Sequence, residues 1–166
     1  PVAAAQPSTG GLRVYDEQLR VQLDQQQALA RQWRAALPRP VMMLASSREG
    51  EELAFLKQWQ ARKADASTAA AQLPQVLIVP RHPQRFDEVA ALCLASGLSL
   101  ARRSGWAGPD SDQPSSTDQA ADLWLGDSLG ELPLYYALAD VALLGGSFAP
   151  LGGQNLIEAA ACGARC

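Results

Sequence analysis

Glycines, an amide and a carboxylate follow one apolar run near the end of the chain. The run is Val141–Leu144, and the residues that could do chemistry after it are Gly146, Ser147, Gly152, Gly153, Asn155 and Glu158. The N–H groups of a glycine-rich loop and the positive end of a following helix favour an anion, such as a phosphate or a sugar carboxylate. Glu158, in the first turns of that helix, is placed to accept hydrogen bonds from ribose hydroxyls. The alternative is a tight turn followed by a solvated glutamate at a helix start.

A basic group follows a second apolar run. Arg81, His82 and Arg85 come directly after Val76–Pro80, and Pro83 suits the first position of a helix. Arginine binds phosphate or carboxylate through a planar fork of two N–H donors, so Arg81 is a candidate for a nucleotide phosphate. Arg85, one turn into the helix, is expected to form a surface salt bridge. His82 has no acid or nucleophile beside it in the sequence and is interpreted as a contact, not a base.

Two further loops carry polar residues after apolar runs. Ser47 and Arg48 follow the first run and precede a stretch rich in glutamate, so Ser47 is expected to cap a helix through its first-turn N–H groups. The same free helix start is an anion site, which keeps Ser46, Ser47 and Arg48 as functional candidates. In the loop that contains Gly130, Ser128 or Asp127 is expected to be an N-cap and Glu131 to complete a capping box, while the loop backbone faces a base.

Short apolar runs and amphipathic stretches must position these loops. We expect core strands at Val41–Ala45, Val76–Val79, Leu98–Ala101, Leu123–Leu125 and Val141–Leu144, separated by helices at Glu49–Lys63, Gln84–Ser96, Leu129–Leu138 and Gly153–Cys162. Alternation at this spacing predicts βαβ units and an α/β fold, with a Rossmann-like, mainly parallel sheet flanked by helices. Ligands of such sheets bind at the carboxyl ends of the strands, where the polar residues fall.

The remaining segments divide into a linker, a helix and a surface loop. Residues 1–15 are predicted to be a linker or inter-domain segment, followed by one nucleotide-sugar-binding domain over 16–166. Within that domain, Asp16–Leu37 is predicted to be an exposed helix with one apolar stripe. Gly105–Gln119 is rich in Gly, Pro, Ser and Asp and is predicted to be a flexible surface loop.

Composition excludes several classes of protein. The 166 residues suit one domain with a core, and 48 % apolar with 19 % charged residues fits a globular protein. A net charge of −3 without a basic cluster argues against nucleic acid as a partner. Three scattered cysteines argue against a disulfide framework or a zinc site. No apolar run approaches the roughly 18 residues needed to cross a bilayer, so we expect this segment to be soluble. The chain is expected to be a fragment, truncated at its end.

Four segments in order resemble the C-terminal domain of the 3-deoxy-D-manno-octulosonic acid (Kdo) transferases. They are Ala45–Glu52, Pro80–Phe86, Leu125–Leu132 and Gly145–Glu158, and Gly10–Asp16 is similar to the stretch that leads into this domain. The resemblance implies the C-terminal half of a GT-B fold. It also implies a glycosyltransferase that carries Kdo from CMP-Kdo to a lipid A precursor of lipopolysaccharide, inverts the sugar centre and uses no cofactor or metal ion.

Site roles follow from the resemblance by position. Arg81 and the Gly146–Ser147 loop are expected to face the CMP phosphate, Gly130 and Glu131 the base, and Asn155 with Glu158 the ribose or phosphate. No catalytic residue is expected here, because the family's general base and acceptor groove belong to an N-terminal half, which would also bring the enzyme to the cytoplasmic face of the bacterial inner membrane. We therefore expect the 166 residues alone to bind CMP-type ligands without turnover. The alternatives are a GT-B transferase that uses a UDP-sugar and a non-catalytic Rossmann-like binding module.

Overall fold

The computed structural model describes residues 10–65, 73–106 and 113–146, with the side chains from Glu17 onward. Its elements alternate strand and helix. The strands are β1 (Val41–Ser47), β2 (Gln75–Pro80), β3 (Leu100–Arg102), β4 (Leu123–Leu125) and β5 (Val141–Leu144). The helices are α1 (Gly10–Ala36), α2 (Glu51–Ala64), α3 (Phe86–Ala95), α4 (Ser116–Ala120) and α5 (Leu132–Leu138), with single 3-10 turns η2 (Pro83–Arg85) and η3 (Arg103–Gly105).

The five described strands form one sheet in the order β3-β4-β2-β1-β5, and every pairing is parallel. The predicted strands and the parallel α/β fold class are thus confirmed. The central strand β2 is buried along its whole length, as expected for a strand covered on both faces. All carboxyl ends therefore lie along one edge of the sheet.

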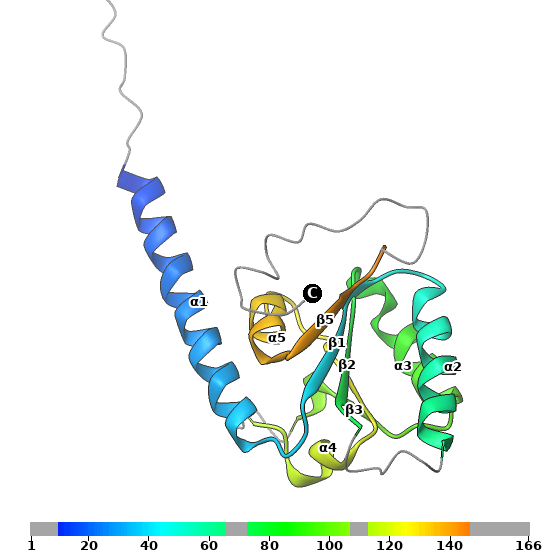
Figure 1. Cartoon of the computed structure of the whole chain (residues 1–166). Coiled ribbons are helices and arrows are strands. Elements are labelled where there is room, and N and C mark those ends of the chain that lie inside the picture. Colours follow the sequence, from blue (N-terminus) through cyan, green and yellow to red (C-terminus); the bar gives the residue numbers. More distant parts are fainter. Residues whose placement is uncertain (1–9, 66–72, 107–112, 147–166) are drawn as a thin grey trace, which may run out of the picture.

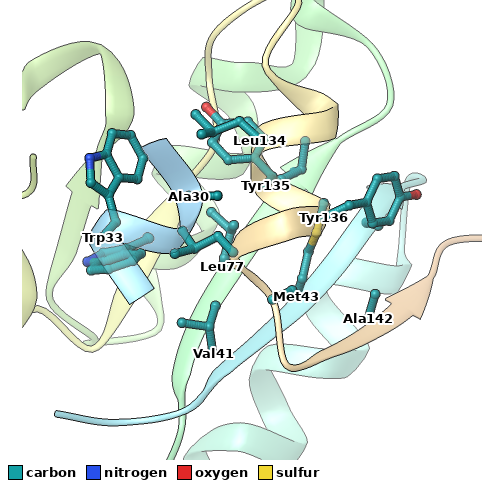
Figure 2. Close-up of a cluster of buried hydrophobic side chains, with 14 of the residues drawn as sticks. Ala30, Trp33, Val41, Met43, Leu77, Leu134, Tyr135, Tyr136 and Ala142 are labelled. Carbon is teal, nitrogen blue, oxygen red and sulfur yellow. The ribbon is translucent and has the colours of Figure 1, made fainter. Parts of the chain in front are cut away.

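Helices cover both faces of the sheet (Figure 1). On one face, Trp33 of α1 and Tyr135 of α5 pack with Leu77 and Met43 of the sheet, all almost fully buried. Figure 2 shows this cluster, in which Ala30 of α1 lies next to Leu134 and Tyr135 of α5. On the other face, helices α2 and α3 pack with Leu44 and Ile78 in a second cluster. Burying a large apolar side chain contributes about 2 kcal/mol, so these two clusters hold the helices against the sheet.

The starts of two helices and the presence of a third helix differ most clearly from the sequence-based expectation. Helix α1 begins at Gly10, before the expected start at Asp16, so residues 10–15 of the expected linker are helical. Helix α5 begins at Leu132 rather than Leu129. Helix α4 lies, except for its last residue, inside the stretch predicted to be a loop. It is capped by Ser115, whose hydroxyl accepts the Asp118 N–H while the Asp118 carboxylate accepts the Ser115 N–H.

Candidate functional site

The carboxyl edge of the sheet brings together residues from loops far apart in the sequence. Ser47 and Arg48 follow β1, Arg81 and His82 follow β2, Gly130 and Glu131 follow β4, and Gly146 follows β5. The parallel pairing of β2, β1 and β5 makes three of these loops neighbours. The described candidates are therefore brought to one edge, as expected. The other candidates, Ser147, Gly152, Gly153, Asn155 and Glu158, lie outside the described residues, as does the predicted helix Gly153–Cys162.

Two hollows open at this edge and share Arg81. The first, which we call the cationic hollow, has a volume of about 870 Å³ and is lined by Arg48, Glu49, Gly50, Arg81, His82 and Arg85. The second, the narrow hollow, has a volume of about 160 Å³; its lining includes Ser46, Pro80, Arg81, Phe86, Leu129, Gly130 and Tyr135. A cation at the junction of a charged and a largely apolar hollow suits a ligand with an anionic group between two unlike parts.

Arg48 is the arginine of the cationic hollow with an unpartnered buried atom. Its Nε is buried and has no hydrogen-bond partner among the described residues. A buried donor without an acceptor costs free energy, so a ligand oxygen here would satisfy a group that the protein leaves open.

Arg85 is held by carboxylates instead. Its guanidinium donates to both oxygens of Glu52 at 2.7 and 3.2 Å and to Glu88. The hydrogen bonds to Glu88 raise the pKa of Arg85, burial opposes them, and the bonds to Glu52 add to them. The expected salt bridge is confirmed, but Glu52 is fully buried, so the pair lies partly inside the protein rather than on its surface.

Ser47 does not cap α2, and this prediction was wrong. The N-cap is Gly50, at φ 88°, with no side-chain hydrogen bond. The buried Ser47 hydroxyl instead donates to Glu52 at 2.7 Å. Ser47 thus lies beside the site and satisfies the buried Glu52 carboxylate.

The Glu131 carboxylate is also engaged within the protein. It accepts hydrogen bonds from Arg103 at 2.8 Å, from Tyr135 at 3.2 Å and from Ser128. The expected capping box is absent, because Glu131 is itself the N-cap and caps no amide through its side chain. Burial raises the pKa of the Tyr135 phenol above its ordinary value, so the phenol stays protonated and can donate.

The loop that carries Gly130 is fixed from two sides. Gly130 has φ 76°, a conformation that favours glycine, and its carbonyl accepts a hydrogen bond from Gln26 of α1 at 2.8 Å. The buried Asp127 carboxylate accepts from Arg102 and Ser104 at 2.7 and 2.6 Å. Burial alone would raise the pKa of Asp127, but the bonds from Ser104 and Arg102 outweigh it and hold that pKa below its ordinary value.

The backbone N–H of Gly146 is bonded to a side chain. It donates to Glu51 Oε1 at 2.7 Å, and Gly146 has φ 79°. From the sequence we expected the Gly146 amide to face an anionic ligand and Glu51 only to lie at a helix start. The bond between them was therefore not predicted. Its signal was weak, because acids are common in the first turn of any helix.

Among the described residues there is neither a metal-binding cluster nor a membrane-spanning helix. No group of three or more His, Cys, Asp and Glu side chains there is arranged to hold a metal ion. None of the described helices combines the length and the apolar character that crossing a membrane requires.

Several known proteins that are similar to this chain are named 3-deoxy-D-manno-octulosonic acid transferase. The chain is 53 % identical over 131 residues to a 3-deoxy-D-manno-octulosonic acid transferase of Bordetella pertussis, a match that covers 79 % of this chain and 28 % of that protein. It is 37 % identical over 122 residues to the enzyme of the same name from Haemophilus influenzae, covering 72 % of this chain and 25 % of that protein. The chain thus spans about a quarter of the length of these relatives. No family model matches it.

A solved structure supports the same assignment. The C-terminal CMP-Kdo binding domain of WaaA from Acinetobacter baumannii superposes with a TM-score of 0.66 at 33 % identity. The match covers 86 % of this chain and 67 % of that one. Identity at this level over most of both chains goes beyond a shared fold. The chain therefore belongs to the 3-deoxy-D-manno-octulosonic acid (Kdo) transferase family.

Proposed function

We propose that this chain is the donor-binding part of a glycosyltransferase that transfers Kdo from CMP-Kdo to a lipid A precursor. The observation that carries the proposal is the match to a CMP-Kdo binding domain over 86 % of the chain. The cationic hollow supports it, because CMP-Kdo is an anion that carries both a phosphate and a sugar carboxylate.

The two hollows suggest how the donor lies. The narrow hollow, with Gly130 and Tyr135 in its lining, takes the cytosine base. Arg81, which lines both hollows, takes the phosphate together with Arg48, and the sugar acid lies in the cationic hollow next to His82. Planar guanidinium groups match the oxygens of phosphate and carboxylate, which favours this orientation over the reverse.

The chemistry assigned to this part of the enzyme is stabilisation of the leaving group. The acceptor hydroxyl oxygen forms the new bond to the sugar, the bond from the sugar to the phosphate oxygen breaks, and CMP departs with the electron pair. Arg81 and Arg48 would offset the negative charge that grows on the phosphate. The base that removes the acceptor proton is assigned to another part of the longer enzyme, in keeping with an inverting GT-B transferase that needs no metal ion. We place the whole enzyme at the cytoplasmic face of the inner membrane, where a lipid acceptor is accessible.

The substitution Arg81→Ala tests the assignment of the phosphate. We expect it to weaken CMP binding to this chain about tenfold or more, since a charged hydrogen bond to phosphate contributes about 1.5–3 kcal/mol. Isothermal titration calorimetry measures the effect. Arg31→Ala is the matched control, because Arg31 is exposed on α1 and lines neither hollow, and it should bind CMP like the unsubstituted chain. Equal affinities for both variants would contradict the assignment.

A second expectation concerns turnover. The 166 residues alone should show no Kdo transfer to a lipid A precursor, because the acceptor site and the base are assigned elsewhere. A transfer assay with CMP-Kdo checks this expectation, and product formed by this chain alone would contradict it.

A further inference from the structure

Two adjacent buried carboxylates stand in the first turn of α2. Glu51 is 7 % exposed and Glu52 is fully buried. A buried carboxylate needs partners that satisfy its charge. Glu52 has the guanidinium of Arg85 and the hydroxyl of Ser47. Glu51 is bonded instead to two backbone amides, so its role requires a separate explanation.

Glu51 joins the loops that follow two neighbouring strands. Its Oε1 accepts the N–H of Gly146, after β5, at 2.7 Å, and its Oε2 accepts the N–H of Arg48, after β1, at 2.9 Å. Hydrogen bonds to an ionised acceptor are roughly twice as strong as neutral ones. One side chain of α2 thus fixes the positions of two loops at the candidate site.

Backbone contacts bring the same two loops together. The Gly145 N–H donates to the carbonyl of Ala45 at 2.8 Å. A Cβ at Gly145 would lie 2.3 Å from the carbonyl oxygen of Ser46, so only glycine fits here. Ser46 itself has φ 52°, in the left-handed region that non-glycine residues rarely adopt. A strained backbone persists only where its surroundings hold it, and the Glu51 bonds to both flanking loops supply part of that support.

Glu51 lies outside both hollows at the edge. It lines a different, apolar hollow of about 250 Å³, together with Leu44, Ala54, Phe55, Gln58 and Leu143. The cationic hollow includes neighbouring Glu49 but not Glu51. Direct contact between the Glu51 carboxylate and a ligand in the cationic hollow is therefore not its role.

We propose that Glu51 is a positioning residue for the donor phosphate. It holds Arg48 and the start of the glycine-rich loop at Gly146 in the arrangement that the phosphate requires, without touching the ligand. The inference rests on the proposed function. Its consequence is specific, since loss of Glu51 should weaken recognition of the phosphate and leave recognition of the base and ribose intact.

The test compares CMP with cytidine, which lacks the phosphate, by NMR titration of the chain and its Glu51→Ala variant. We expect CMP binding to weaken about tenfold while cytidine binding changes less than about twofold. Hydrogen exchange of the Gly146 amide should accelerate in the variant, because that amide loses its acceptor. Glu17→Ala is the control: Glu17 is an exposed glutamate of α1 that lines neither hollow, and its loss should not weaken CMP binding.

Every other outcome contradicts either the inference about Glu51 or the proposed function. Unchanged CMP binding by Glu51→Ala overturns the inference and leaves the proposed function standing. Equal losses for CMP and cytidine also overturn it, because Glu51 would then support the fold in general. If the alanine variant does not fold, Glu51→Gln takes its place. The amide oxygen of glutamine can accept one of the two N–H groups, so the affinity for CMP should fall about threefold. An unchanged affinity overturns the inference. Absence of CMP binding by the unsubstituted chain would overturn the proposed function itself.

Discussion

At the scale of single residues, the arginines at the carboxyl edge fall into two groups. Arg85, Arg102 and Arg103 are each held by a carboxylate of the protein, Glu52, Asp127 and Glu131 respectively. The Arg48 guanidinium, by contrast, has no ion pair or hydrogen bond within the described part of the chain, and its Nε, like that of Arg103, is buried without a partner. The structure thus uses some arginines to hold loops in place and leaves the cationic hollow with donor capacity for a ligand.

The Arg85–Glu52 pair should be important for stability. Arg85→Ala leaves the buried Glu52 carboxylate without its cation, and removing one partner of a buried pair costs about 3–5 kcal/mol. We expect a loss of at least about 2 kcal/mol in the free energy of unfolding, because Arg85 remains 14 % exposed and water can partly replace it. Urea unfolding followed by circular dichroism measures the difference.

The matched control for Arg85 is its exposed partner. Glu88 is 52 % exposed, and exposed ion pairs contribute about 0–1 kcal/mol. Glu88→Ala should therefore change stability by less than about 1 kcal/mol. Similar losses of unfolding free energy in both variants would show that the buried pair contributes no more to stability than the exposed pair.

The sequence was enough to predict which residues lie at the carboxyl edge, but not which side chains they form hydrogen bonds with. The rule that ligands meet the carboxyl ends of parallel strands identified Arg48, Arg81 and His82 as edge residues. The engagement of Ser47 with Glu52 depends on α2 and Arg85, which no local pattern reveals. Likewise, the Glu131 carboxylate is held by Arg103, which is distant in sequence and is stacked 5.3 Å from the rings of Trp33 and Trp106.

At the scale of elements, short apolar runs sufficed to identify the strands. Leu123–Leu125 and Val141–Leu144 match the sequence-based ranges. Leu123–Leu125 is buried at every position, as a strand covered on both faces must be apolar at successive positions, whereas Val141 of β5 is exposed. The order of the strands could not be read locally, since it depends on long-range packing. Helix α4 was missed because its five residues carry no apolar periodicity, although Ser115 and Asp118 have the spacing of a capping box.

The junction of β1 and β5 provides the prediction at this scale. Gly145→Ala places a Cβ 2.3 Å from the Ser46 carbonyl oxygen, so the backbone of one strand end must shift. We expect a loss of about 2 kcal/mol or more in the free energy of unfolding, in the range of overpacked sites. Thermal and urea unfolding test this value.

Gly105→Ala is the control for that substitution. Gly105 has open space around its missing Cβ and no positive φ, so alanine should be neutral or stabilise by up to about 1 kcal/mol. A Gly145→Ala variant as stable as this control would contradict the close approach of the two loops.

At the scale of the whole molecule, the sheet gathers loops from β1, β2, β4 and β5 into one edge with two hollows joined at Arg81. The family was inferred from four short segments in order, and the fold class from the alternation of strands and helices. The similarity to relatives confirms the family, and the parallel sheet confirms the fold class. The hollows themselves could not have been inferred, because their shape depends on how side chains from several loops pack together.

The most direct measurement is a calorimetric titration of the unsubstituted chain with CMP and, in parallel, with UDP. We expect CMP to bind measurably and more tightly than UDP, because the narrow hollow is assigned to cytosine and the junction at Arg81 to a single phosphate. Tighter binding of UDP would point to a different sugar nucleotide. Binding of neither nucleotide would contradict the assignment of this edge as a donor site.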